Sequence, residues 1–158
     1  CYFEKMDFTY FHTRNCTDMQ YMFYNCATTV LDLSTFDTRN VKTMAHMFNA
    51  TRVDTLNMSS FNTRKVESMA CMFEEAYIKK SLLFPKHFNT QNLIHAMDMF
   101  SLACIQTLDL RDFYINHGAS TDGIFDELAA EQVIITKKDT YLNMRVKECI
   151  DADKIKEV

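Results

Sequence analysis

The chain contains two glycines, one proline and no tryptophan among its 158 residues. Such scarcity of glycine and proline excludes collagen-like and low-complexity sequence and argues against a phosphate site built on a glycine-rich loop. No apolar run reaches the roughly 18 residues that a membrane-spanning helix needs. The net charge of −4 lacks the basic excess of a general nucleic-acid binder. A single folded domain remains, with no function implied by composition.

Two short motifs recur along the chain with one period. A phenylalanine followed by a polar turn begins at Phe11, Phe36, Phe61, Phe88 and Phe113. A hydrophobic pair ends at Phe23, Phe48, Phe73, Phe100 and Phe125. Both series advance by 25, 25, 27 and 25 residues. Two independent motifs with one period identify an internal repeat, and we predict a bulged connection where the two extra residues lie, between Phe73 and Phe88.

Each repeat contains one predicted strand and one predicted short helix. Apolar and polar residues alternate at 31–34, 56–59 and 108–110, the period of a half-buried strand. Residues 6–8, 82–84 and 133–135 occupy equivalent positions. Apolar residues at steps of three and four, as in residues 16–23, predict one or two turns of α- or 3-10 helix. Asp18, Thr43 and Ser68 are the predicted caps of these helices.

Units this short bury a core only by stacking, which predicts a solenoid with a parallel sheet. The predicted fold is an α/β repeat solenoid: a leucine-rich-repeat-like, right-handed coil with a parallel sheet on one face and short helices or 3-10 turns on the other. Residues 1–125 form about five units of 25 residues, the first of them truncated. Residues 126–158 form a terminal strand and a C-terminal cap or linker.

The unit from Leu31 to Phe48 resembles the BspA-like leucine-rich repeats of bacterial surface proteins and mycoplasma lipoproteins. Those repeats read approximately L-D-L-S-x-F-D-T-S-N-V-x-x-M-x-x-M-F-x-x-C. The resemblance extends from residue 1 to about residue 125; the departures are arginine in place of serine, the insertion and a degraded fifth unit. It implies a location at the cell surface or outside the cell, and adhesion to a host or neighbouring-cell protein or glycan.

The function that we predict is therefore a non-enzymatic interaction or adhesion module of a cell-surface protein. Two alternatives remain: an intracellular, cytoplasmic scaffold or spacer, which the unpaired-looking cysteines favour, and the targeting arm of a larger enzyme. The predicted module uses no cofactor, binds no nucleic acid, does not insert into a membrane, and is a monomeric piece of a longer array.

Two rows of polar residues are the candidate binding sites. Alternation turns one row outward from the strand ends: Asp32, Ser34, Asn57, Ser59 and Asp109. Arg14, Arg39 and Arg64 stack along one edge of the coils. The rows are either a binding surface for an acidic or glycan partner or a solvated face copied with the repeat. The nearby Asn15, Asn40 and Asn92 are expected to serve the turn, because asparagine tolerates left-handed backbone.

No catalytic or metal-binding residues are predicted. The recurring methionines, such as Met44 and Met69, fit core positions better than a soft-metal site. The six cysteines include no C-x-x-C pair and no zinc-type spacing with histidine, and the histidines fall at different repeat positions. Cys1 and Cys26 lie one coil apart, which permits either a disulfide or free thiols.

Overall fold

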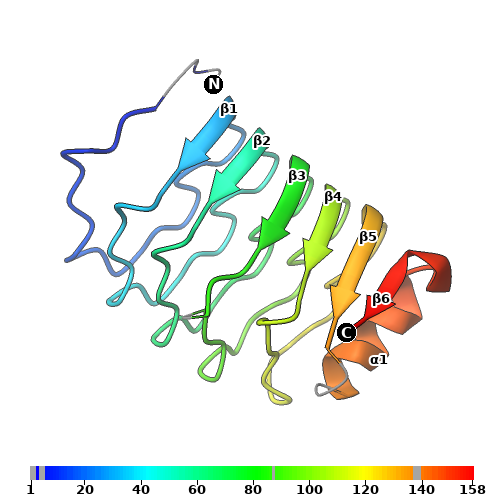
Figure 1. Ribbon diagram of the computed structural model, residues 1–158. Helices are drawn as coiled ribbons and strands as arrows, with labels where there is room; N and C mark the ends of the chain where they lie inside the picture. Colours follow the sequence, from blue (N-terminus) through cyan, green and yellow to red (C-terminus); the bar gives the residue numbers. More distant parts are fainter. Residues whose placement is uncertain (1–2, 4–5, 87, 137–139) are drawn as a thin grey trace.

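A computed structural model describes residues 3, 6–86, 88–136 and 140–158. The chain winds into a parallel β-solenoid of about five coils (Figure 1). One parallel sheet holds, in sequence order, β1 (Ala27–Asp32), β2 (Arg52–Asn57), β3 (Tyr77–Leu83), β4 (Cys104–Asp109), β5 (Ala129–Ile135) and β6 (Ile155–Glu157). Helix α1 (Thr140–Cys149) and a 3-10 turn at Ala152–Lys154 lie between β5 and β6. No helix in these described ranges is long and apolar enough to cross a membrane.

The insertion in the fourth repeat is absorbed within and just after one strand of the sheet. Paired residues of β3 and β4 are 27 positions apart at Tyr77 and Cys104, but 26 apart at Leu82 and Leu108. One of the two extra residues therefore forms a bulge inside β3, and the other lies beyond the strand. The predicted bulged connection is confirmed.

The second face of the solenoid is built from β-turns, and the predicted helices do not form within the described part of the repeats. Two residues per coil have positive φ, which is unfavourable in a right-handed helix. The first set is Tyr21, His46, Cys71, Asp98 and Gly123; the second is Asn25, Ala50, Glu75, Leu102 and Glu127. We call this stack, which spans residues 19–26, 44–51, 69–76, 96–103 and 121–128, the turn face.

Backbone hydrogen bonds on the turn face alternate between the next coil and the local turn. Met19 N–H donates to the carbonyl of Thr43 in the next coil at 3.0 Å, whereas Met22 N–H donates to the carbonyl of Met19 at 3.4 Å. The predicted helix caps Asp18 and Thr43 instead form a parallel bridge with each other. Every second N–H on the turn face therefore donates to the next coil, so the consecutive i to i−4 hydrogen bonds of an α-helix do not form.

The core consists of columns of equivalent side chains. Consecutive rings of one column stack with centroids 5.3 to 5.7 Å apart: Phe23, Phe48, Phe73, Phe100 and Phe125. The repeat methionines Met19, Met44, Met47, Met69, Met72 and Met99 are buried, and Met22 is partly buried. The prediction that methionines fill the core is confirmed.

The two ends of the solenoid differ. Residues 6–8, predicted as a strand, form none; Phe8 and Phe11 instead lie against Phe36, with ring centroids 5.2 and 5.7 Å away. At the other end, α1 contributes Leu142 and Val146 to the core, and β6 pairs with β5. The last coil is therefore covered by a helix and a strand (Figure 1).

Candidate functional site

The predicted polar row is made of strand-end side chains that also shape the turn after each strand. Asp32 Oδ1 accepts a hydrogen bond from the Ser34 N–H at 3.0 Å, and Asn57 Oδ1 accepts one from the Ser59 N–H at 3.0 Å. Asn57 Nδ2 also donates to Asp32 Oδ1 at 2.9 Å. Hydrogen bonds from Ser34 hold the pKa of Asp32 below its ordinary value. Ser34 and Ser59 are exposed, so these four residues lie together on the surface.

The row does not continue along the whole sheet. Leu83 on β3 lies opposite Asp109 on β4 and is 57% exposed, so an apolar side chain interrupts the row. Asp109 is only 6% exposed, so the prediction that it adds an exposed carboxylate to the row is wrong. Arg111 covers it and donates from Nε to Asp109 Oδ1 at 2.9 Å. Burial raises the pKa of Asp109, but the hydrogen bonds and charge of Arg111 hold it below its ordinary value.

The arginine edge is exposed but partly neutralised. Arg14, Arg39 and Arg64 all reach solvent. Arg39 Nε pairs with Asp37 Oδ1 at 2.9 Å; this hydrogen bond lowers the pKa of Asp37, and the charge of Arg14 lowers it further. The ion pair of Arg39 is therefore with Asp37, which does not belong to the polar row.

The asparagines beside this edge tie neighbouring coils together. Asn40 Nδ2 donates to the carbonyl of Arg14 at 2.9 Å, and Asn92 Nδ2 donates to the carbonyl of Arg64 at 2.6 Å. Neither these asparagines nor Asn15 has positive φ. The expectation of a left-handed backbone at these positions is therefore wrong, and the side-chain amide is what the repeat uses.

An open hollow of about 340 Å³ lies on the outer face of the sheet, across β3, β4 and β5. The small side chains of Cys104 and Ala129 line it, together with Tyr77. Lys79, Lys154 and Glu131 also border it, so two ammonium groups and one carboxylate lie beside this partly apolar surface. A hollow with these properties suits an apolar side chain of a partner, with polar contacts at its border.

The hollow exists because side chains become smaller along one row of the sheet. The register places Ala27, Arg52, Tyr77, Cys104 and Ala129 side by side. Two large residues are followed by two small ones, which leaves space above β4 and β5. Sequence reasoning followed the polar strand ends and missed this row, although the change in size was readable once the repeats were aligned.

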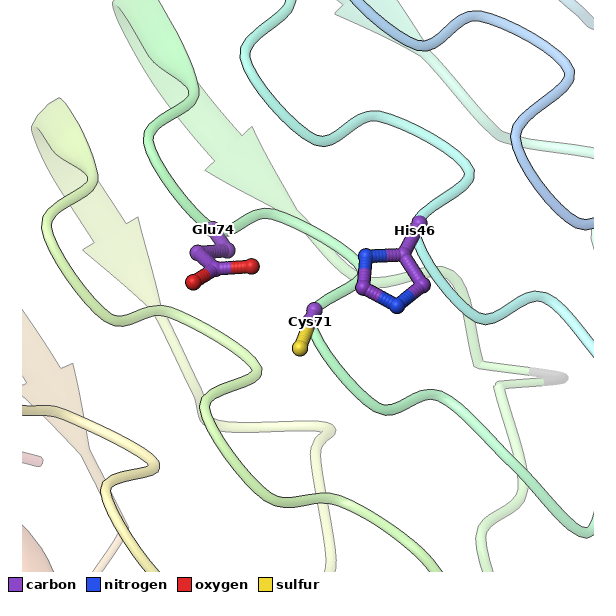
Figure 2. A group of neighbouring side chains, drawn as sticks. All are labelled: His46, Cys71 and Glu74. Carbon is purple, nitrogen blue, oxygen red and sulfur yellow. The ribbon is translucent and has the colours of Figure 1, made fainter.

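A separate group of three side chains gathers on the turn face. His46, Cys71 and Glu74 each place one potential ligand atom within 4.8 Å of the other two. Figure 2 shows His46 on one coil, directed toward Cys71 and Glu74 on the next. All three side chains are half-buried. Nitrogen, sulfur and oxygen ligands of these types occur together at zinc sites.

Negative charge surrounds this group. Burial, together with the hydrogen bond to Glu74 and its charge, raises the pKa of Cys71 to about 12, and the charge of Asp98 adds to the effect. Burial and the charges of Glu74, Asp126 and Asp122 raise the pKa of Asp98. A thiol in such surroundings stays protonated at neutral pH, so Cys71 is not prepared to act as a nucleophile.

Sequence reasoning singled out none of these three residues, because it looked for ligands spaced along one loop or helix. His46 and Cys71 are 25 positions apart, which is one period of the repeat. An alignment of the repeats would therefore have placed His46 and Cys71 at equivalent positions of neighbouring coils. Of the predicted cysteine neighbours, Cys1 lies outside the described residues, and Cys26 packs partly buried against the core.

Comparison with known proteins identifies a family. No curated protein and no solved structure matches the chain. The protein-family model described as "Mycoplasma protein of unknown function, DUF285" matches residues 2–113. Because this match covers well over half of the 158 residues, the chain belongs to the DUF285 family.

Proposed function

We propose that the array is a non-enzymatic protein-binding module that mediates adhesion at a cell surface, and that its units are BspA-like leucine-rich repeats. The hollow across β3, β4 and β5 is the observation that carries this proposal. A solenoid offers an extended surface to a large partner, and a hollow within that surface provides a place for one anchoring side chain.

The chemistry of the hollow specifies the partner segment. Its volume of about 340 Å³ accommodates one large apolar or aromatic side chain next to Tyr77. Lys79 pairs with Asp54 at 3.4 Å, and Lys154 pairs with Asp151 at 3.1 Å. Exposed ion pairs of this kind contribute little stability, so a carboxylate of the partner can replace the present one. The proposed ligand is therefore a protein segment with an aromatic or aliphatic residue flanked by acidic residues.

The test uses two substitutions in the same row of the sheet. Ala129→Trp fills the hollow, whereas Ala27→Trp adds an equal side chain at the equivalent position of β1, away from it. Binding of the purified chain to immobilised extracellular-matrix proteins and mucins is measured at equilibrium. We expect Ala129→Trp to weaken binding about tenfold or more, and Ala27→Trp to leave it unchanged. Equal effects of both substitutions, or no binding to any of these proteins, would contradict the proposal.

The proposed location has its own test. Intact source cells are treated with protease and then probed with an antibody to this domain. Loss of the domain from intact cells supports a surface adhesion module. Protection until the cells are lysed contradicts it and favours the alternative of an intracellular scaffold.

A further inference from the structure

We propose that His46, Cys71 and Glu74 bind one divalent cation of the zinc class on the turn face. This site joins two consecutive coils and is independent of the hollow on the sheet. The backbone, the three donor atoms and the residues around them each support it.

The backbone brings the three side chains together by the repeat itself. His46 and Cys71 occupy the same position of consecutive coils, with φ values of 55° at both. The N–H of His46 donates to the carbonyl of Ala70 at 2.9 Å, which fixes the approach of the two coils. The N–H of Glu74 donates to the carbonyl of Cys71 at 3.2 Å, which closes a turn and returns Glu74 toward the thiol. The site therefore rests on ordered backbone.

The donor atoms need only small movements to surround a cation. Zinc–ligand bonds of 2.0–2.3 Å in a tetrahedron place ligand atoms about 3.5 Å apart. The three ligand atoms here lie within 4.8 Å of one another. Because His46, Cys71 and Glu74 are half-buried, rotation of the side chains can close this difference without moving the coils.

Neighbouring side chains orient two of the ligands. Asn49, which is only 8% exposed, donates from Nδ2 to Glu74 Oε2 at 2.6 Å and lies 3.3 Å from His46 Nδ1. The ring of Tyr21 stacks on the ring of His46, with centroids 4.6 Å apart and planes 6° from parallel. Metal-binding histidines and carboxylates commonly have such supporting contacts. If the cation binds His46 Nδ1, the amide of Asn49 moves from the ring and keeps its bond to Glu74.

The donor set selects the kind of cation. Magnesium and calcium require oxygen ligands, whereas thiolate, imidazole and carboxylate together match zinc. Three protein ligands leave a fourth position for water. The carboxylates of Glu74 and Asp98 favour a cation here, and the Cys71 thiol releases its proton when the cation binds, because the thiolate is the form that ligates a metal.

Cobalt is the spectroscopic probe for this site. The purified chain is titrated with Co²⁺, because thiolate–Co²⁺ charge transfer absorbs in the near ultraviolet and tetrahedral Co²⁺ gives intense visible bands. We expect one Co²⁺ per chain, displacement by Zn²⁺, and a higher Tm when Zn²⁺ is present. Absence of the charge-transfer band at millimolar Co²⁺ would overturn the proposal.

Matched variants separate this site from the other thiols. Cys71→Ala is expected to abolish the charge-transfer band, and Cys104→Ala, which removes an exposed thiol on the sheet face, is expected to retain it. Asn49→Ala should weaken Zn²⁺ binding about 10–100-fold. Glu74→Gln preserves the side-chain shape and should weaken binding without changing the far-ultraviolet circular dichroism in EDTA. Equal affinities of Cys71→Ala and Cys104→Ala would refute the assignment, whatever their stabilities.

Discussion

Threonines at one position of the repeat differ in how their hydroxyl groups are satisfied. Thr38 Oγ1 donates to the carbonyl of Asn62 at 3.1 Å and accepts from the N–H of Asn62 at 2.8 Å. Thr63 Oγ1 donates to the carbonyl of Asn89 at 2.9 Å. Thr90 Oγ1 is buried and has no partner among the described residues. Substitution by valine, which has nearly the same shape, should therefore have effects of different size and sign.

The magnitudes follow from the hydrogen bonds that each substitution removes. A buried donor or acceptor left without a partner costs about 1–3 kcal/mol. Thr38→Val leaves two such groups and should lower the free energy of unfolding by about 2–6 kcal/mol. Thr63→Val leaves one and should lower it by about 1–3 kcal/mol. Thr90→Val removes a hydroxyl that is already unpaired and should raise the free energy of unfolding by about 1 kcal/mol.

Urea unfolding measures these differences. The chain has seven tyrosines and no tryptophan, so tyrosine fluorescence is followed together with far-ultraviolet circular dichroism. The two probes must give one transition, because repeat proteins can unfold in parts. A loss of stability in Thr90→Val as large as that in Thr63→Val would refute the reasoning, since it would mean that the hydroxyl contributes without a partner.

Three further outcomes are expected in the same unfolding assay. Ala50 has a φ of 54°, which glycine adopts more easily than alanine, so Ala50→Gly should raise the free energy of unfolding by about 0.5 kcal/mol. Ala45 has no positive φ, so Ala45→Gly should lower it by about 1 kcal/mol. A loss of stability in both variants would contradict this reasoning. Phe73→Leu should cost about 1–3 kcal/mol more than Phe61→Leu, because only Phe73 stacks between two rings; equal costs would show that stacking adds nothing. Asp109→Asn should lower the free energy of unfolding by about 1 kcal/mol at pH 7. Because the folded-state pKa of Asp109 is lowered, the difference between wild type and variant should shrink as the pH falls below about 4. A difference of the same size at pH 2 would contradict the charged pairing with Arg111.

The repeat period predicted the solenoid because a constant period places equivalent residues of successive coils above one another. Two motifs with one spacing place their phenylalanines in columns, and Phe48 and Phe73 are fully buried as such a column requires. The same spacing did not predict the turn face. Met19 and Met22, three residues apart, point inward from a helix turn and equally from a β-turn. The feature that decides between them is positive φ at residues such as His46 and Ala50, and neither residue type signals it.

The candidate surfaces depend on side-chain contacts that the alternation of apolar and polar residues does not show. Alternation predicted an exposed side chain at Asp109, but Arg111, two positions later, covers it. The hollow depends on the sizes of Tyr77, Cys104 and Ala129, which become neighbours only when strands pair. The contact between Asp109 and Arg111 lies within one repeat, whereas the hollow requires comparison across coils.

The insertion shows how the sheet and the turn face tolerate change differently. Its two residues are taken up in and after β3, while the turn face keeps its bonding: the N–H of His46 donates to Ala70, and the N–H of Cys71 donates to Met97, both at 2.9 Å. The offsets of 24 and 26 differ by the inserted two residues. A side chain at this position therefore meets its counterpart in the next coil even when the spacing along the chain varies. Ligand motifs in such arrays should be sought at equivalent turn positions, where Asp98 follows Cys71, rather than at a fixed number of residues.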